Sequence, residues 1–403
     1  MPEQVVKQRS RGFICINAHP EGCSRNVEQQ MQAIKSHRAS RAAGPGTALV
    51  IGSSTGYGLA SRVALAWGFG AKTVGVFFER QPEGAKTAAA GYYNTAAFDR
   101  LARKDGIYAA HINGDAFSNE VKRQTVDCLR RDVGSVDLVI YSLASPRRTH
   151  PGTGEVFNSV LKPIGASYTG RTVDFTNGKI SEVTVDPASK EEIAATVAVM
   201  GGDDWKMWID LLLAEDLLSE GARTLAYSYI GPELTWPIYR DGTIGAAKND
   251  LAQTARNLNV TLQSKTGGNA WVSVNKGVVT QASAAIPVVP LYMSLLFRVM
   301  KGKGTHEGCI EQMRRLAFDY LADGALGRRD GNDLIRLDDL EMRDDVQSSV
   351  RALWPQVTTE NLAGLSDIAG FRRDFNQLFG FDVEGVDYDA PIETDVRLRL
   401  ASE

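Results

Sequence analysis

Tyr239 and Lys248 are the two side chains whose types and spacing best suit acid catalysis, because they form the pattern Tyr-x8-Lys. A tyrosine can donate a proton, and its unperturbed pKa is about 10. A neighbouring ammonium stabilises the phenolate, so we expect Lys248 to bring the pKa of Tyr239 toward neutrality. Many chains place a tyrosine and a lysine at this distance by chance. The pair therefore needs support from the elements that position it.

A glycine-rich turn gives that support. The apolar run Ala48–Ile51 predicts a buried strand, and Leu59–Trp67 predicts an apolar helix. Gly52, Gly56 and Gly58 lie between them. This order of strand, glycine turn and helix is typical of dinucleotide sites, because the N–H groups that begin the helix bind the pyrophosphate. The spacing Gly-x3-Gly-x-Gly is that of short-chain dehydrogenases and reductases. A glycine-rich turn that binds nothing is the alternative.

Each position in this turn has a predicted role. Gly52 allows a sharp bend, Gly56 leaves room for the pyrophosphate, and Gly58 permits close packing of helix on strand. Ser53 belongs to the same cofactor site. Tyr57 is expected to cover the adenosine or to limit the space beside the ribose 2′ position.

The next predicted strand ends in an acidic residue. Val74–Phe78 is apolar and Glu79 follows it, where a carboxylate can accept hydrogen bonds from the adenosine ribose. The same carboxylate would repel a 2′-phosphate, which favours NADH over NADPH. Arg80 weakens that preference, since an arginine can receive the phosphate. Lys248 gains a second role here, because its ammonium can hold the nicotinamide ribose.

Further strands and helices alternate along the chain. Strands are predicted at Tyr108–Asn113, Val136–Ser142, Thr224–Ile230 and Ala270–Val274, with helices between them. Repeated strand–helix units predict an α/β fold with a Rossmann-type, doubly wound parallel sheet. Alternating residues on both sides of Asn177-Gly178 predict an inserted β-hairpin with a two-residue type I′ turn.

We expect the whole chain, 1–403, to form a single catalytic domain with four additions to the nucleotide fold. They are an N-terminal extension (1–46), a β-hairpin unit (146–188), substrate-binding helices (280–300) and an acidic C-terminal extension (323–403). The last of these can also be interpreted as a surface appendage that covers a sheet edge.

Ligands of such sheets bind at the carboxyl ends of the strands. We therefore predict cofactor contacts from residues at or near those ends, including Asp115 as an acceptor for the adenine amine. A helix N-cap before Phe117 is the alternative role for Asp115. The remaining predicted cofactor contacts are Phe78, Ala116, Leu143, Ala144, Val278 and Thr280.

Longer motifs extend over nearly the whole chain. They are Gly12–Cys23, Gly52–Gly58, Tyr141–Arg147, Ser228–Glu233 running into Tyr239, Lys276, and Thr280–Pro287. Together with Tyr-x8-Lys, they resemble the FabV-type enoyl-acyl-carrier-protein reductases and the similar trans-2-enoyl-CoA reductases. The resemblance implies NADH-dependent reduction of the trans-2 double bond of enoyl thioesters, the last step of fatty-acid elongation, by a monomer.

The resemblance also assigns roles to side chains. It implies Tyr239 as the acid, Lys248 as its support, and Tyr229 as a second active-site hydroxyl near the thioester carbonyl. A strand-end tyrosine packed under a loop is the alternative for Tyr229. The acyl chain would contact Tyr229, Thr280, Ala284 and Ile286. Without this resemblance, the apolar segment that contains Ala284 and Ile286 would be interpreted as part of the hydrophobic core.

Composition narrows the other possibilities. Lysine and arginine number 45 against 48 aspartates and glutamates, so the net charge of -3 argues against a nucleic-acid partner. No apolar run reaches membrane-spanning length. Four cysteines lack a framework spacing, which favours a reducing cytoplasm. We expect no metal site.

Two other functions share the same motifs. One is a short-chain carbonyl reductase that acts on ketones or alcohols, which would keep the cofactor site and the Tyr/Lys pair. The other is a non-catalytic NAD-binding scaffold. The presence of both Tyr239 and Lys248 argues against the scaffold.

Overall fold

The computed structural model describes residues 3–11, 14–37, 43–284, 286–325 and 327–401. Gly12, Phe13 and Ala285, which belong to two of the motifs above, lie outside these residues. Within the described ranges, every helix is too short or too polar to cross a lipid bilayer.

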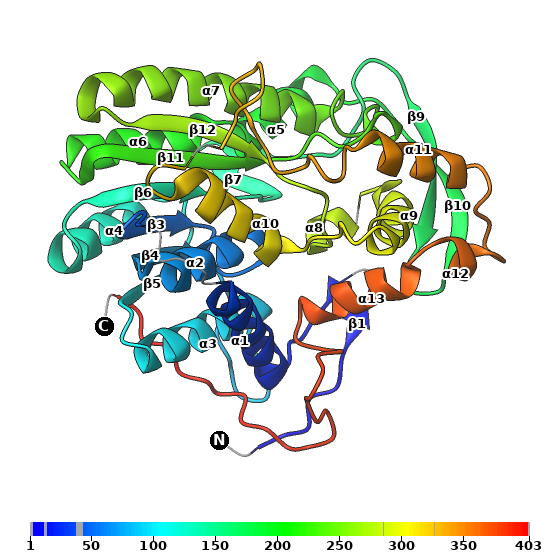
Figure 1. The fold of residues 1–403 in the computed structure, drawn as a ribbon, viewed down its shortest axis with the longest axis horizontal. Helices are drawn as coiled ribbons and strands as arrows, with labels where there is room; N and C mark the ends of the chain where they lie inside the picture. Colours follow the sequence, from blue (N-terminus) through cyan, green and yellow to red (C-terminus); the bar gives the residue numbers. More distant parts are fainter. Residues whose placement is uncertain (1–2, 12–13, 38–42, 285, 326, 402–403) are drawn as a thin grey trace.

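A seven-stranded sheet of order β13-β12-β11-β6-β3-β4-β5 forms the centre of the molecule (Figure 1). All neighbouring strands are parallel. Chain order reverses between β3 and β6, which is where open α/β sheets bind their ligands. The predicted α/β fold is confirmed. The strands are β3 (Thr47–Ile51), β4 (Lys72–Phe77), β5 (Ala109–Asn113), β6 (Val136–Tyr141), β11 (Leu218–Ser228), β12 (Asn269–Val274) and β13 (Ile335–Arg336).

Helices cover both faces of the sheet (Figure 1). Strand β3 shows why, since Ala48 and Val50 enter one apolar cluster whereas Leu49 and Ile51 enter another. A strand buried on both faces needs a helical layer on each. One layer holds α1 (Pro20–Ser36), α2 (Gly56–Phe69), α3 (Ala90–Lys104) and α10 (Cys309–Arg315). The other holds α4 (Asn119–Asp132), α6 (Asp203–Ala214) and α7 (Thr243–Thr266), with α5 (Lys190–Met200) packed beside α7.

A third apolar cluster lies beyond the carboxyl ends of the strands, around α9 (Val289–Gly302). The inserted hairpin contributes Val173 and Phe175 to it. Figure 1 shows the hairpin strands beside the last helices of the chain. The elements around α9 in this cluster are β9 (Tyr168–Asp174), β10 (Lys179–Val185), α8 (Gln281–Ala284), α11 (Asp344–Leu353), α12 (Leu362–Leu365) and α13 (Ile368–Gln377).

The predicted type I′ turn at Asn177-Gly178 is wrong. Asp174 pairs with Lys179, so four residues form the loop rather than two. Gly178 has a φ of 79°, whereas Asn177 is not in the left-handed region that a type I′ turn requires at both positions. The carboxylate of Asp174 instead accepts hydrogen bonds from the backbone N–H of Thr176 at 2.9 Å and from the Asn177 amide at 2.7 Å.

Several element boundaries also differ from the prediction. Helix α1 lies in the N-terminal extension and begins at Pro20, because His19 caps it by accepting from the Gly22 N–H at 3.2 Å. The strand expected at Thr224–Ile230 is β11, which begins earlier, at Leu218, and ends at Ser228. Helix α10 is followed by a π-helix at Leu316–Leu321. The remaining short elements are β1 (Ser10–Arg11), β2 (Ile14–Cys15), β7 (Arg147–Thr149), β8 (Val156–Asn158) and a 3₁₀ turn at Glu233–Thr235.

The acidic C-terminal extension covers a sheet edge, as one interpretation predicted, because β13 pairs with β12. It is more than a surface appendage, however. Glu341 is fully buried, and Val346 and Phe371 belong to the third apolar cluster. The extension therefore helps to build the interior beside the candidate site.

Candidate active site

The glycine turn after β3 owes its sequence to close packing and to backbone conformation. Gly52 has a φ of +85°, and a Cβ atom there would lie 2.0 Å from the Ser142 carbonyl oxygen. A Cβ atom at Gly58 would lie 1.8 Å from the Gly52 carbonyl oxygen. Gly56 differs, since its φ is +52° and no described atom comes within 4 Å of the Cβ position. The turn is thus closed at its two ends and open at Gly56, at the N-terminus of α2.

Ser53 and Tyr57 face other parts of the protein. The backbone N–H and the hydroxyl of Ser53 both donate to the Val76 carbonyl, at 3.0 and 3.2 Å, and the side chain is fully buried. Its hydroxyl is therefore turned toward the sheet, and Ser53 can meet a nucleotide only through its place in the turn. The Tyr57 hydroxyl donates to the Lys276 carbonyl at 2.5 Å, which links the glycine turn to the loop after β12.

Glu79 is held firmly at the carboxyl end of β4. Its backbone N–H donates to the Asn113 side chain at 2.9 Å, and its carboxylate accepts from the Ser54 hydroxyl at 2.8 Å. Burial raises the pKa of this carboxyl. The neighbouring Phe78 ring is 76% exposed, so an apolar face lies open to an adenine beside the acidic group.

The ends of β5 and β6 complete this edge. Asp115 accepts from the Phe117 N–H at 3.0 Å, but the N-cap of α4 is Ser118, so the N-cap role considered for Asp115 is wrong. Ala116 is buried in the core, and its carbonyl accepts from Lys122. Leu143 lies against the glycine turn, 3.1 Å from the Cβ position of Gly52, and Ala144 is exposed.

The two tyrosines are neighbours with different partners. Their rings meet edge to face, with centroids 5.1 Å apart. The Tyr229 hydroxyl donates to a Glu341 carboxylate oxygen at 3.0 Å. Within the described part of the chain, the Tyr239 hydroxyl makes no hydrogen bond, and the side chain is half-buried. Tyr239 is thus the hydroxyl that remains available to a ligand.

Lys248 lies on α7 and binds backbone rather than Tyr239. Its ammonium donates to the Tyr227 carbonyl at 3.0 Å. Burial raises the pKa of Tyr239, and no nearby charge offsets that rise, so the expected lowering by Lys248 is wrong for the protein alone. Burial also lowers the pKa of Lys248 to about 8. Its charge is therefore sensitive to mildly alkaline pH.

The predicted acyl-binding segment is anchored in the third apolar cluster. Thr280 and Ser283 exchange hydrogen bonds at the start of α8, at 2.8 and 2.9 Å. Ala284 is 3% exposed within that cluster, and the half-buried Ile286 packs on its surface. Val278 is half-buried in the loop before α8. Ala284 is therefore part of the core, which is the placement expected without the family.

The sequence did not reveal the group that holds Tyr229. Glu341 lies in an acidic segment, where one carboxylate among many carries no signal. Its partners besides Tyr229 are Tyr292 and the Gly277 backbone, which come from distant parts of the chain. Only the tertiary structure brings them together.

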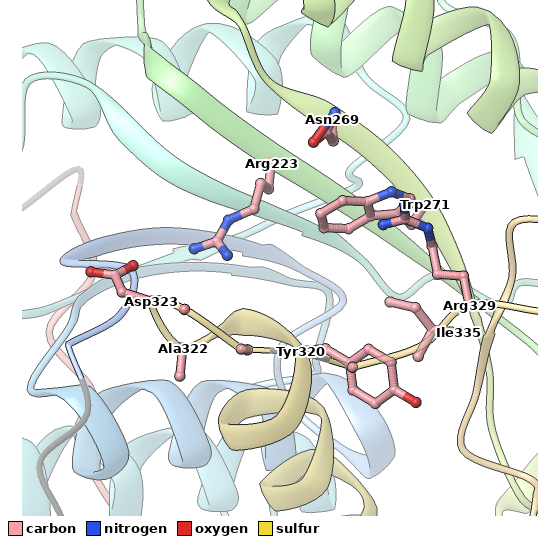
Figure 2. Close-up of a pocket in the computed structure, with 11 residues that line it drawn as sticks. Arg223, Asn269, Trp271, Tyr320, Ala322, Asp323, Arg329 and Ile335 are labelled. Atoms are coloured by element: carbon pink, nitrogen blue, oxygen red, sulfur yellow. The ribbon is translucent and has the colours of Figure 1, made fainter.

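Other residues line a separate cavity of about 350 Å³ (Figure 2). It is lined by Arg223, Asn269, Trp271, Arg329 and the segment around Ala322–Ala325. Asn269 and Trp271 come from the amino-terminal half of β12, whereas the candidate site lies beyond the carboxyl ends of the strands. No predicted site residue lines this cavity.

The fold and this edge are those of a nicotinamide-dependent oxidoreductase with a Rossmann-type sheet. Matches to two family models identify the family. Residues 86–321 match the trans-2-enoyl-CoA reductase catalytic region, and residues 5–84 match the NAD(P)H binding domain of trans-2-enoyl-CoA reductase. The chain belongs to the trans-2-enoyl-CoA reductase family, which includes proteins named enoyl-acyl-carrier-protein reductase.

Individual relatives cover almost the full length. An enoyl-acyl-carrier-protein reductase [NADH] of Flavobacterium johnsoniae is 58% identical over 96% of this chain and 97% of its own. A trans-2-enoyl-CoA reductase [NADH] of Ruminiclostridium cellulolyticum is 54% identical over 98% and 99%. The structure of Treponema denticola trans-2-enoyl-CoA reductase in complex with NAD superposes with a TM-score of 0.95, at 49% identity over 98% of this chain and 100% of that one.

A third family model, described as an enoyl reductase FAD binding domain, matches residues 329–392. These residues do not fit a flavin. The one strand among them, β13, is two residues long and is followed by no glycine turn and helix of the kind at Gly52–Gly58. Their apolar side chains, including Val346, Phe371 and Phe375, fill the third core cluster. The glycine turn and Glu79 fit NADH instead.

Proposed function

We propose that this protein reduces the trans-2 double bond of enoyl thioesters with NADH. The observation that carries the proposal is the Tyr239 hydroxyl, which has no hydrogen-bond partner among the residues that the structure describes. It is a proton donor beside Tyr229, and Lys248 follows it on α7. A half-buried donor that is free to bind a substrate oxygen is suited to stabilise the charge that develops there.

The chain's own residues suggest how NADH would be held. The open turn at Gly56 and the N-terminus of α2 suit the pyrophosphate. Glu79 and Asp115 suit the adenosine, and the Lys248 ammonium suits the nicotinamide ribose. When bound, NADH supplies a hydride from nicotinamide C4 to C3 of the thioester.

Tyr239 would act on the negative charge that develops at the thioester carbonyl oxygen. Its O–H donates to that oxygen, and the proton needed at C2 completes the reduction, so one NADH and one proton are consumed for each double bond. The raised pKa of Tyr239 keeps the proton in place until charge appears.

The first test follows NADH oxidation by absorbance with a short trans-2-enoyl-CoA, beside a panel of ketones. Consumption with the thioester alone is the expected result. Turnover of ketones without turnover of the thioester would move the protein to the carbonyl reductases. NADH binding without turnover of either would indicate a scaffold.

We further propose that the whole chain acts as one catalytic body, as a monomer in the cytoplasm, in the last step of fatty-acid elongation. The buried Glu341 supports the single body, because a residue of the C-terminal extension contacts Tyr229. Light scattering checks the oligomeric state. Matched enoyl-CoA and enoyl-acyl-carrier-protein substrates decide the carrier.

A further inference from the structure

Glu341 is a buried carboxylate that receives three hydrogen bonds. One oxygen accepts from the hydroxyls of Tyr229 at 3.0 Å and Tyr292 at 2.7 Å. The other accepts from the Gly277 N–H at 2.7 Å. The residue has no exposed surface. Such a carboxylate needs several donors, because burial without them would leave a charge unsatisfied.

The direction of these bonds fixes where the tyrosine protons are. An ionised carboxylate only accepts, and a phenol has one proton to donate. Burial raises the pKa of the Glu341 carboxyl, whereas the ammonium of the buried Lys276 and the three donors lower it. The Tyr229 hydroxyl, the Tyr292 hydroxyl and the Gly277 N–H all donate to its two oxygens. The Tyr229 proton is therefore committed to Glu341, whereas the Tyr239 proton is not.

Glu341 is itself held in place. The amide of Gln347 donates to the Glu341 backbone carbonyl at 2.7 Å and to the Tyr292 hydroxyl at 3.1 Å. The turn at Gly277 packs on Tyr229, since a Cβ atom at Gly277 would lie 3.3 Å from the Tyr229 hydroxyl. The ring of Tyr229 then stands edge-on against Tyr239. A chain of contacts thus runs from the C-terminal extension to the candidate acid.

We propose that Glu341 is a positioning residue for the reduction: it holds the Tyr229 hydroxyl so that the Tyr229 ring supports Tyr239, and Tyr239 alone donates to the substrate carbonyl. This inference rests on the proposed enoyl reductase function. It gives the two neighbouring tyrosines different roles.

The test is a set of three variants assayed with NADH and a short trans-2-enoyl-CoA. Glu341→Gln keeps the shape but places an NH₂ group where three donors point. We expect its kcat to fall about tenfold, because small displacements of catalytic groups are costly, while the Kd for NADH, from fluorescence titration, changes less than about twofold. The kcat of Tyr229→Phe should fall by a similar factor. The double variant should be no worse than the worse single one, because both changes break one link.

Glu307→Gln is the matched control. Glu307 is another buried carboxylate, paired with Arg315 at 2.9 Å, and it contacts neither tyrosine. This substitution also removes the negative charge of a buried carboxylate from the same region. We expect kcat to stay within about twofold of the wild-type value.

Three results would overturn the inference. They are an unchanged kcat in Glu341→Gln, multiplied losses in the double variant, and a loss in Tyr229→Phe as large as that in Tyr239→Phe, which would make Tyr229 a donor too. The last comparison needs no Glu341 variant, so it applies even if Glu341→Gln fails to fold. An inactive wild type would instead refute the proposed function, and this inference with it.

Discussion

The glycine turn and the pair of tyrosines lie at the same edge of the sheet but are built in opposite ways. The turn is one contiguous stretch, Gly52–Gly58, shaped by its own backbone and by β6 beside it. The tyrosine pair depends on Glu341, Tyr292 and Gly277, which the chain supplies up to 112 positions away from Tyr229. Local sequence thus determines the cofactor side, and tertiary packing determines the substrate side.

The largest effect should come from Tyr239→Phe, which separates chemistry from cofactor binding. We expect kcat to fall about 100-fold or more, which is the usual contribution of a general acid. The Kd for NADH, measured by fluorescence titration, should stay within about twofold, since the hydroxyl contacts no part of the glycine turn. An unchanged kcat would remove Tyr239 from the acid role.

On the cofactor side, Gly58→Ala should disrupt the turn itself. The new Cβ atom would lie 1.8 Å from backbone. We expect the free energy of unfolding to fall by about 3 kcal/mol, the upper range for overpacking, with weaker NADH binding. Urea unfolding with and without NADH measures both. Gly364→Ala is the control, because nothing lies within 4 Å of its Cβ position; an equal loss there would show that the packing argument is wrong.

The two sides meet at Lys248, which makes activity depend on pH. The pKa of its ammonium is lowered to about 8, so kcat/KM should fall as pH rises through about 8 and the charge is lost. The free energy of unfolding should change in the opposite sense and increase with pH. The unfolded chain binds the proton more tightly, so unfolding becomes less favourable as pH rises from about 8 toward the usual lysine value.

The variant Lys248→Arg tests that assignment, because arginine keeps its charge up to about pH 12. Its remaining kcat/KM should not fall near pH 8. If the same decline persists in Lys248→Arg, another group causes it.

The smallest expected effect concerns the choice between NADH and NADPH. Glu79 is fixed by Asn113 and Ser54, so its carboxylate should repel a 2′-phosphate. We expect a strong preference of the wild type for NADH, and about a tenfold smaller preference in Glu79→Gln, equivalent to about 1.4 kcal/mol. The ratio of kcat/KM values for the two nucleotides measures it. Equal kcat/KM values of the wild type for NADH and NADPH would mean that Arg80 receives the phosphate.

The same contrast explains what the sequence could predict. Strand β3, the glycine turn and α2 follow from local apolar runs and glycine spacing, and the structure has them within a few residues of the predicted bounds. The Tyr-x8-Lys pattern pointed to Tyr239, whose hydroxyl is available to a ligand. The effect of Lys248 on the pKa of Tyr239 could not be foreseen, because it depends on where the ammonium finds a carbonyl.

Other differences have similar causes. The inward turn of Ser53 depends on the Val76 carbonyl of the neighbouring strand, which no spacing reveals. The turn at Asn177-Gly178 was assigned from a dipeptide, whereas the Asp174 carboxylate selects a longer loop. In each case a contact made after folding overrides the local preference.

The position of Glu341 has a consequence for the order in which the protein becomes functional. Chains are synthesised and begin to fold from the N-terminus. The glycine turn, Glu79 and both tyrosines leave the ribosome before Glu341 and the helix α11 that follows it. A nascent chain can therefore complete its nucleotide cradle well before Tyr229 gains the carboxylate that holds it. Proteolytic cleavage between the π-helix and β13, with loss of the released piece, would return the enzyme to that earlier stage.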